Sequence, residues 1–167
     1  MKEYLILEEF LGYRLNRLAM TVSQQLRGVY SRKYGLTIPE FRVLVTLGQF
    51  DVMTAKAIGI HTWMHKTKVS RAVEGLSKRR WLSRQPNPDD RREEFLSLTG
   101  LGREAYSKIV PDIYAYQTRL TEELGPQATG DLLDAITKLE RAVGIGPTDP
   151  KLLERFSDRE LAEASHA

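Results

Sequence analysis

Hydrophobic residues recur at intervals of three and four in two long stretches, one near each end of the chain. Such spacing places them on one face of an α-helix. The first stretch predicts a helix from Leu7 to about Arg32, which Gly35 ends. The second predicts a last long helix at coiled-coil-like spacing. The hydrophobic positions are Leu11, Leu15, Leu18, Val22, Leu26 and Val29 in the first stretch, and Leu132, Ile136, Leu139 and Val143 in the second.

Shorter helices are predicted between these two stretches. Thr37-Ile38-Pro39-Glu40 has the residue types of a capping box with proline in the first turn, so a helix begins there and continues to about Gly48. Thr54 caps a third helix that ends at His61 or Thr62. A fourth helix starts near His65 or Lys66 and runs to about Arg80.

Two strand-like segments follow, Trp81 to Gln85 and Glu94 to Leu98, joined by a loop rich in proline and charge. Thr99 then caps a long helix, which Pro111 should bend, and Gly125-Pro126 makes a turn into the last helix. The expected fold is therefore mainly α-helical with a small β-hairpin.

The regular hydrophobic faces of the terminal helices must be buried against something, and a second copy of the chain offers matching helices. We expect one structural domain with four parts. Residues 1–34 and 99–146 would form dimerisation helices, residues 35–98 a compact lobe, and residues 147–167 a tail.

Composition and charge narrow the possible functions. The chain has 167 residues, 41% of them hydrophobic and 28% charged, and no cysteine, which excludes disulfides and thiolate metal sites. No apolar run approaches the roughly 18 residues of a membrane span, and the first residues lack the basic start of a signal peptide. We therefore expect a cytoplasmic protein without a membrane partner.

Between His65 and Arg103 there are ten Lys/Arg against five Asp/Glu, whereas the remainder has fifteen against seventeen. A basic segment on a slightly acidic body points to a polyanion as its partner.

The fourth helix has the pattern of a DNA-reading helix. Its apolar residues share one face, and short hydroxyls and long cations occupy the other, a mixture suited to phosphates and base edges in a major groove. With the preceding helix and turn it makes a helix-turn-helix. The inward residues are Val69, Ala72, Val73 and Leu76, and the outward ones are Thr67, Ser70, Arg71 and Lys78, with Lys68 at the edge. On these residues alone, an ordinary amphipathic surface helix is the alternative.

The hairpin after this helix favours the DNA interpretation. Its stiff loop would form a wing that lays Arg91 and Arg92 along a neighbouring minor groove or the DNA backbone. We expect Asp90 to hold the loop by an internal salt bridge.

Together these segments make the chain resemble the multiple-antibiotic-resistance-regulator (MarR) family of winged-helix repressors. The family pattern is matched by Lys66, Val69-Ser70-Arg71, Pro88, Asp89-Asp90-Arg91-Arg92, Leu98-Thr99 and Gly102, and the resemblance extends from the first helix to about Gly144. Two positions depart from it. His65 stands where the family usually has Asp, so that a pH-dependent cap would replace the usual one, and Asn87 replaces the first Asp of the wing.

The resemblance implies a homodimer that binds a pseudo-palindromic operator and responds to a small molecule. The DNA contacts would be Lys66, Thr67, Lys68, Ser70, Arg71, Lys78, Arg91 and Arg92. The segment from Gly12 to Met20 resembles that of a subgroup whose members respond to aromatic carboxylates or their thioesters. Arg14 and Arg17 would anchor the carboxylate, and the walls of the site would be Tyr13, Met20, Phe41, Trp63 and Met64, although each of these residues could equally belong to the core or surface of a dimer helix.

Other functions find less support. Gly100-Leu101-Gly102-Arg103-Glu104-Ala105 matches a dinucleotide motif, but no second strand follows its helix. His61 and His65 are spaced for metal binding, yet they straddle a helix break and lack further ligands. No catalytic motif is apparent, so we expect neither an enzyme nor a cofactor. A protein-interaction module that has lost DNA binding, or a metal-responsive regulator, remains the alternative.

Overall fold

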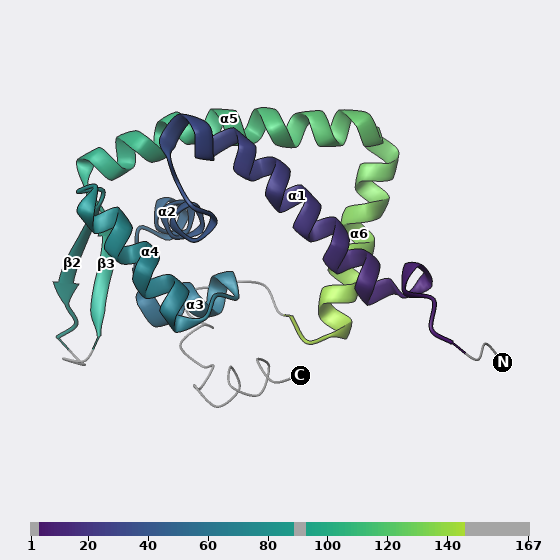
Figure 1. Cartoon of the computed structure of the whole chain (residues 1–167), viewed down its shortest axis with the longest axis horizontal. Coiled ribbons are helices and arrows are strands. Elements are labelled where there is room, and N and C mark those ends of the chain that lie inside the picture. Colours follow the sequence, from purple (N-terminus) through teal and green to yellow (C-terminus); the bar gives the residue numbers. More distant parts are fainter. Residues whose placement is uncertain (1–3, 89–92, 146–167) are drawn as a thin grey trace.

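The computed structural model describes residues 4–88 and 93–145 and shows a small helical lobe attached to a frame of long helices (Figure 1). Six α-helices, a short 3-10 turn and three strands make up this part of the chain. In order they are the 3-10 turn Leu7–Glu9, α1 (Leu11–Tyr34), α2 (Ile38–Phe50), β1 (Val52–Thr54), α3 (Ala55–Thr62), α4 (Lys66–Lys78), β2 (Leu82–Pro86), β3 (Glu94–Leu98), α5 (Gly100–Leu124) and α6 (Pro126–Ala142).

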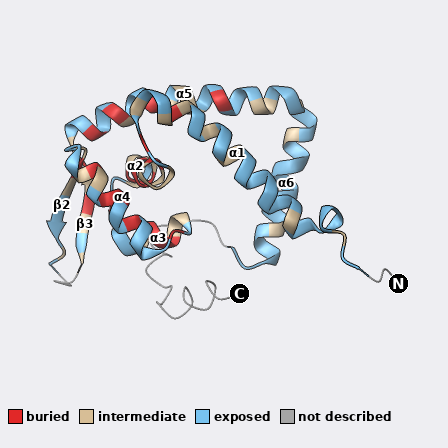
Figure 2. Ribbon diagram, viewed as in Figure 1, coloured by how far each residue is buried: buried red, intermediate tan, exposed pale blue. Residues whose placement is uncertain are grey.

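The long helices α1, α5 and α6 form the frame. In Figure 1, α5 runs along the top from the lobe to α6, and the N-terminal half of α1 extends away from the lobe. Most residues of α1 and α6 are exposed, whereas buried residues gather in α2, α3, α4, β3 and the first part of α5 (Figure 2). In the described part of the chain, the hydrophobic stripes of the terminal helices therefore remain largely exposed; Leu18 is 56% exposed and Leu132 is 43% exposed.

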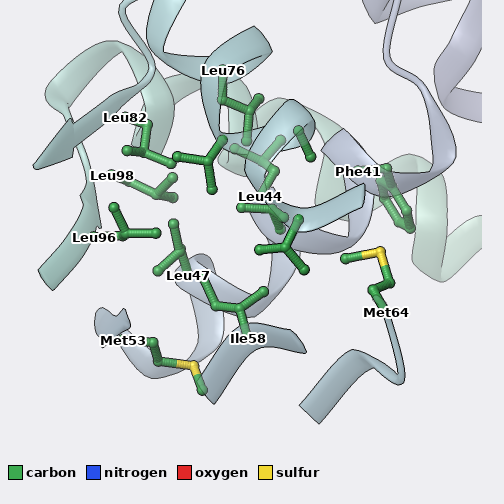
Figure 3. Close-up of a cluster of buried hydrophobic side chains, with 14 of the residues drawn as sticks. Phe41, Leu44, Leu47, Met53, Ile58, Met64, Leu76, Leu82, Leu96 and Leu98 are labelled. Atoms are coloured by element: carbon green, nitrogen blue, oxygen red, sulfur yellow. The ribbon is translucent and has the colours of Figure 1, made fainter. Parts of the chain in front are cut away.

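The core lies inside the lobe, where α2 is surrounded by α3, α4 and the sheet (Figure 3). Leu44, Leu47, Ile58, Leu76 and Leu96 are all essentially inaccessible to solvent. Burial of a leucine or isoleucine side chain contributes about 1.5–3 kcal/mol, so this cluster is the main source of the stability of the lobe.

Threonine caps start three of the helices, as the sequence predicts. The side chain of Thr37 accepts from the Glu40 N–H while the Glu40 carboxylate accepts from the Thr37 N–H, completing the capping box. Thr54 and Thr99 accept in the same way from the N–H groups of Ala57 and Gly102. The first long helix ends at Gly35, as predicted, and this glycine has a left-handed conformation with a φ of 64°.

Several boundaries differ from the sequence predictions. The first long helix begins at Leu11 because Phe10 is extended and separates it from the 3-10 turn. The second continues past Gly48, where the ring of Tyr106 occupies the space that a side chain would need. The fourth ends at Lys78 because Arg80 turns the chain with a φ of 60°. The helix that contains Pro111 continues to Leu124.

The hairpin is part of a three-stranded antiparallel sheet with the order β1-β3-β2. β2 and β3 form the predicted hairpin, with Leu82 opposite Leu98 and Pro86 opposite Glu94. The third strand, β1, was not predicted; it pairs with the other edge of β3, with Met53 opposite Leu96. The central strand of the sheet is therefore held on both sides.

Candidate nucleic-acid interface

The fourth helix has the two faces that its sequence predicts. Val69, Ala72, Val73 and Leu76 are buried against the lobe. The opposite face is open to solvent and carries the predicted DNA-contacting residues of this helix, namely Lys66, Thr67, Lys68, Ser70, Arg71 and Lys78. A helix anchored by one apolar face can therefore present hydroxyls and cations to a ligand on the other.

The turn before α4 is tight. Trp63 has a left-handed conformation, with a φ of 53°, and the Met64 N–H donates to the carbonyl of Gly59 at 2.9 Å. A Cβ atom on Gly59 would lie 3.1 Å from the Met64 carbonyl oxygen, which is tighter than most contacts of this kind. A glycine near the end of α3 therefore lets the two helices of the helix-turn-helix approach closely.

His65 caps α4 at its N-terminus. Its Nδ1 atom accepts from the Thr67 N–H at 3.3 Å, so the ring provides the acceptor that a helix start needs. A protonated Nδ1 cannot accept a hydrogen bond, and the cap therefore exists only while this nitrogen is free of a proton.

The exposed face of α4 has an excess of positive charge. Lys78 pairs with Glu74 at 2.7 Å, one turn earlier, and this contact lowers the pKa of the glutamate. No ion pair among the described residues involves Lys66, Lys68 or Arg71. These three cations remain available to an anionic ligand.

The wing leaves the lobe next to α4. Arg84 on β2 pairs with Glu94 on β3 at 3.2 Å, and the Asn87 N–H donates to the Glu93 carbonyl at 3.1 Å near the end of the hairpin. The predicted contact residues Arg91 and Arg92 lie outside the described residues, as do Asp89 and Asp90.

The seven predicted ligand-binding residues fall into two groups. Phe41 and Met64 are both buried in the core of the lobe (Figure 3). Phe41 also stacks on Tyr30 with the ring centroids 4.0 Å apart. Trp63, in the adjacent turn, is 68% exposed. The remaining four, Tyr13, Arg14, Arg17 and Met20, lie on the N-terminal half of α1; Tyr13 is half-buried and the others are exposed. One chain therefore does not bring the arginines and the lobe residues together in a single site.

Two residues near these groups were not singled out from the sequence. Tyr30 continues the hydrophobic stripe of α1, one turn after Leu26, so its burial against Phe41 follows from a signal already present. Arg79 lies at the end of α4 and donates to carbonyls at the end of α1. No local pattern reveals that contact, because its partners are more than forty residues away.

The glycine-rich motif and the histidine pair, which the sequence offered as alternatives to DNA binding, have other roles in the structure. Gly102 packs directly on the backbone of Trp81, and the sheet is antiparallel, so the glycine motif serves helix packing. The ring of His61 meets Phe50 edge-on, while His65 caps α4. No group of three or more possible metal ligands occurs among the described residues, and none of the described helices could cross a membrane.

Comparison with known proteins agrees with this architecture. Residues 36–93, which contain the helix-turn-helix and the first strand of the hairpin, match the sequence model of the MarR family. No curated protein matches the chain.

Solved structures match over most of the chain. A MarR-family transcriptional regulator from Silicibacter pomeroyi is 24% identical with a TM-score of 0.70, covering 84% of this chain and 94% of that one. The repressor CouR, solved with a 23-mer DNA duplex, is 26% identical with a TM-score of 0.71, covering 83% and 99%. BpsR from Bordetella bronchiseptica, whose DNA binding is regulated by 6-hydroxynicotinic acid, is 22% identical with a TM-score of 0.71, covering 83% and 98%. The lobe therefore resembles the MarR family in sequence, and most of the chain shares the fold of solved MarR-family regulators.

Proposed function

We propose that the chain is a DNA-binding transcriptional repressor, rather than an enzyme, and that it acts as a homodimer on a pseudo-palindromic operator. The observation that carries this proposal is the exposed face of α4, where hydroxyls and unpaired cations lie opposite a buried apolar face. Direct readout in a major groove uses these side-chain types. The wing would add Arg91 and Arg92 to the same surface.

The exposed apolar faces of α1 and α6 support the homodimer. In the described part of the chain, α6 has no buried residue, although its leucines repeat at helical spacing. Contiguous apolar surface of this kind marks an interaction site. A second copy would cover it, and residues 1–34 and 99–146 would then be the dimerisation parts around the lobe of residues 35–98.

A small aromatic carboxylate, a phenol or a related thioester would release the repressor from DNA. BpsR, with a similar fold, has its DNA binding regulated by an aromatic acid. In this chain the arginines on α1 and the aromatic residues beside α4 are separate within one copy, so Arg14 or Arg17 would reach Trp63 only across the dimer. Binding there would shift the population toward a dimer whose lobes no longer fit the operator.

The test is a titration of the full-length protein onto duplex DNA from upstream of its own gene, at two salt concentrations. Arg71→Ala should weaken specific binding by about 1–3 kcal/mol. Arg91→Ala with Arg92→Ala should weaken binding to all duplexes alike and reduce the salt slope by about one to two units. Arg103→Ala, which removes an exposed arginine from α5, is the matched control and should bind like the wild type.

A panel of aromatic acids and their thioesters, added to the preformed complex, tests the ligand. Release by one member would identify the class of signal. Binding that no member reverses would refute the aromatic effector and keep the DNA function. A wild-type chain that binds no duplex at low salt would refute the DNA function and favour the protein-interaction module.

A further inference from the structure

One arginine joins the end of the DNA-reading helix to the end of a dimerisation helix. Arg79 is the C-cap residue of α4, and its guanidinium donates from Nη1 to the Tyr34 carbonyl at 3.2 Å and from Nη2 to the Gly35 carbonyl at 2.8 Å. Carbonyls at the end of a helix have no partner within it, and the helix dipole makes that end negative. The guanidinium therefore supplies both hydrogen-bond donors for the carbonyls and a positive charge for the negative end of α1.

Further contacts fix the orientation of this guanidinium. The Nε atom lies 3.9 Å from Oε1 of Glu40, and the Cζ atom lies 5.3 Å from the centre of the Trp81 ring. The other oxygen of Glu40 accepts from the N–H and the hydroxyl of Thr37 at the start of α2, each at 2.8 Å. The Glu40 side chain is only 12% exposed. Arg79 is thus held against a carboxylate that is itself held in place.

The same carboxylate lies against α4 one turn before Arg79. A Cβ atom on Gly75 would overlap with Oε1 of Glu40, so this glycine permits the close approach of α2 and α4. Glu40 therefore contacts α4 at Gly75 and at Arg79, and the C-terminal half of α4 is positioned by one polar cluster.

The last turn of α1 is also tied to α5. Lys33 donates to Asp112 at 2.8 Å, and the Tyr34 hydroxyl lies 3.0 Å from Asp112 and donates to the Lys108 carbonyl at 2.9 Å. One side of this turn thus faces the frame and the other faces Arg79. Among the described residues, the two hydrogen bonds of Arg79 are the only ones that join the end of α1 to the end of α4.

We propose that Arg79 is a positioning residue that fixes the recognition helix relative to the dimerisation frame and so sets the half-site spacing that the dimer accepts. The inference rests on the proposed function of a homodimer on DNA. In such a dimer, the separation and angle between the two α4 helices depend on how each is attached to the helices that join the two copies. Arg79 provides a direct attachment of this kind.

The contact requires an arginine. The guanidinium is planar and presents its donors in a fixed fork, so that it reaches two carbonyls and faces the Glu40 carboxylate at once. A lysine keeps the charge but offers a single ammonium group on a flexible stem. Arg79→Lys therefore separates positioning from the general attraction of positive charge to DNA.

The experiment begins with an operator selected in vitro by the full-length wild-type protein. Three duplexes are made with the selected spacer between the half-sites, one base pair more and one base pair fewer. Since B-DNA turns once in about 10 bp, each change rotates a half-site by roughly 35°. Dissociation constants are measured for wild type, Arg79→Lys and the control Arg103→Lys, whose residue pairs with Asp51 at 3.2 Å on the surface.

The wild type should prefer the selected spacing, and Arg103→Lys should keep that preference. In Arg79→Lys, the ratio of dissociation constants for altered and selected spacing should fall by about tenfold, equivalent to about 1.4 kcal/mol. Affinity for a non-specific duplex should be equal in all three proteins. Thermal unfolding checks that each is folded; if Arg79→Lys is not, Glu40→Gln, which removes the charge facing Arg79, should reduce the spacing preference in the same direction.

Two results would overturn the inference while leaving the proposed function intact. One is an unchanged spacing preference in Arg79→Lys, and the other is a uniform loss of affinity for all duplexes with the ratio preserved. A wild type that binds one operator without any spacing preference would also overturn it. A wild type that binds no duplex would instead refute the proposed function, and the inference would fall with it.

Discussion

The two glycines at the start of α5 should differ sharply in their tolerance of a methyl group. Gly102 lies where the first turn of α5 crosses the backbone before β2. A Cβ atom there would overlap with the carbonyl oxygen of Trp81 and lie 3.0 Å from its carbonyl carbon. At Gly100, in the same turn, a Cβ atom meets nothing within 4 Å. Gly102→Ala and Gly100→Ala are therefore a matched pair.

The magnitude follows from what would have to move. The atoms facing Gly102 belong to the backbone, so they cannot rotate away as a side chain can, and overpacking of this kind costs about 1–3 kcal/mol. The Trp81 carbonyl also accepts from the Thr99 N–H at 3.0 Å, and Thr99 caps α5. Weakening that hydrogen bond adds about 1 kcal/mol. We expect Gly102→Ala to lower the free energy of unfolding by about 2–4 kcal/mol.

Gly100→Ala should instead leave stability unchanged or raise it by up to about 1 kcal/mol, because alanine restricts the unfolded chain more than glycine does. Urea unfolding followed by circular dichroism measures both variants against the wild type at one fixed protein concentration, since in the proposed homodimer stability would depend on concentration. Equal effects of the two substitutions, or a Gly102→Ala protein as stable as the wild type, would refute the packing role assigned to Gly102.

Two further predictions concern pH. The hydrogen bond from Lys33, and then the one from Tyr34, lowers the pKa of Asp112 below its ordinary value of 3.8, so the stabilisation present above that value should be lost in acid as the carboxylate is protonated. In Lys33→Ala, NMR titration should find the pKa of Asp112 closer to 3.8. An unchanged pKa would show that the ion pair does not form in solution. Burial lowers the pKa of His61 from its ordinary value of 6.5. Below pH 6.5 the unfolded chain therefore takes up a proton that the folded chain does not, and the free energy of unfolding should fall as the pH drops. His61→Phe should reduce this fall between pH 7.5 and pH 5.5, and an identical pH dependence would contradict the assignment.

The features predicted well from the sequence are those governed by neighbouring residues. The capping box of Thr37 and Glu40, the end of the first helix at Gly35 and the third helix at Ala55–Thr62 all depend on contacts within a few positions. The two faces of α4 follow from helical geometry alone. Each of these features was confirmed by the structure.

The features that were missed depend on distant partners. β1 has three residues, too few to show an alternating pattern, and it is a strand because β3 pairs with it more than forty positions later. α2 continues through Gly48 to Phe50, and the ring of Tyr106 from α5 packs against this glycine. The ligand residues proposed on α1 and in the lobe stay a prediction, because the fold of one chain does not bring them together.

The position of β3 in the centre of the sheet has a consequence for how this protein could diversify. Pairing on both edges fixes the register of β3 by residues well below the tip of the hairpin. Insertions or deletions at the tip therefore need not alter the sheet or the helix-turn-helix packed beside it. Under the proposed function, the reach of the wing along DNA and the choice of bases at α4 could thus change independently in the course of evolution.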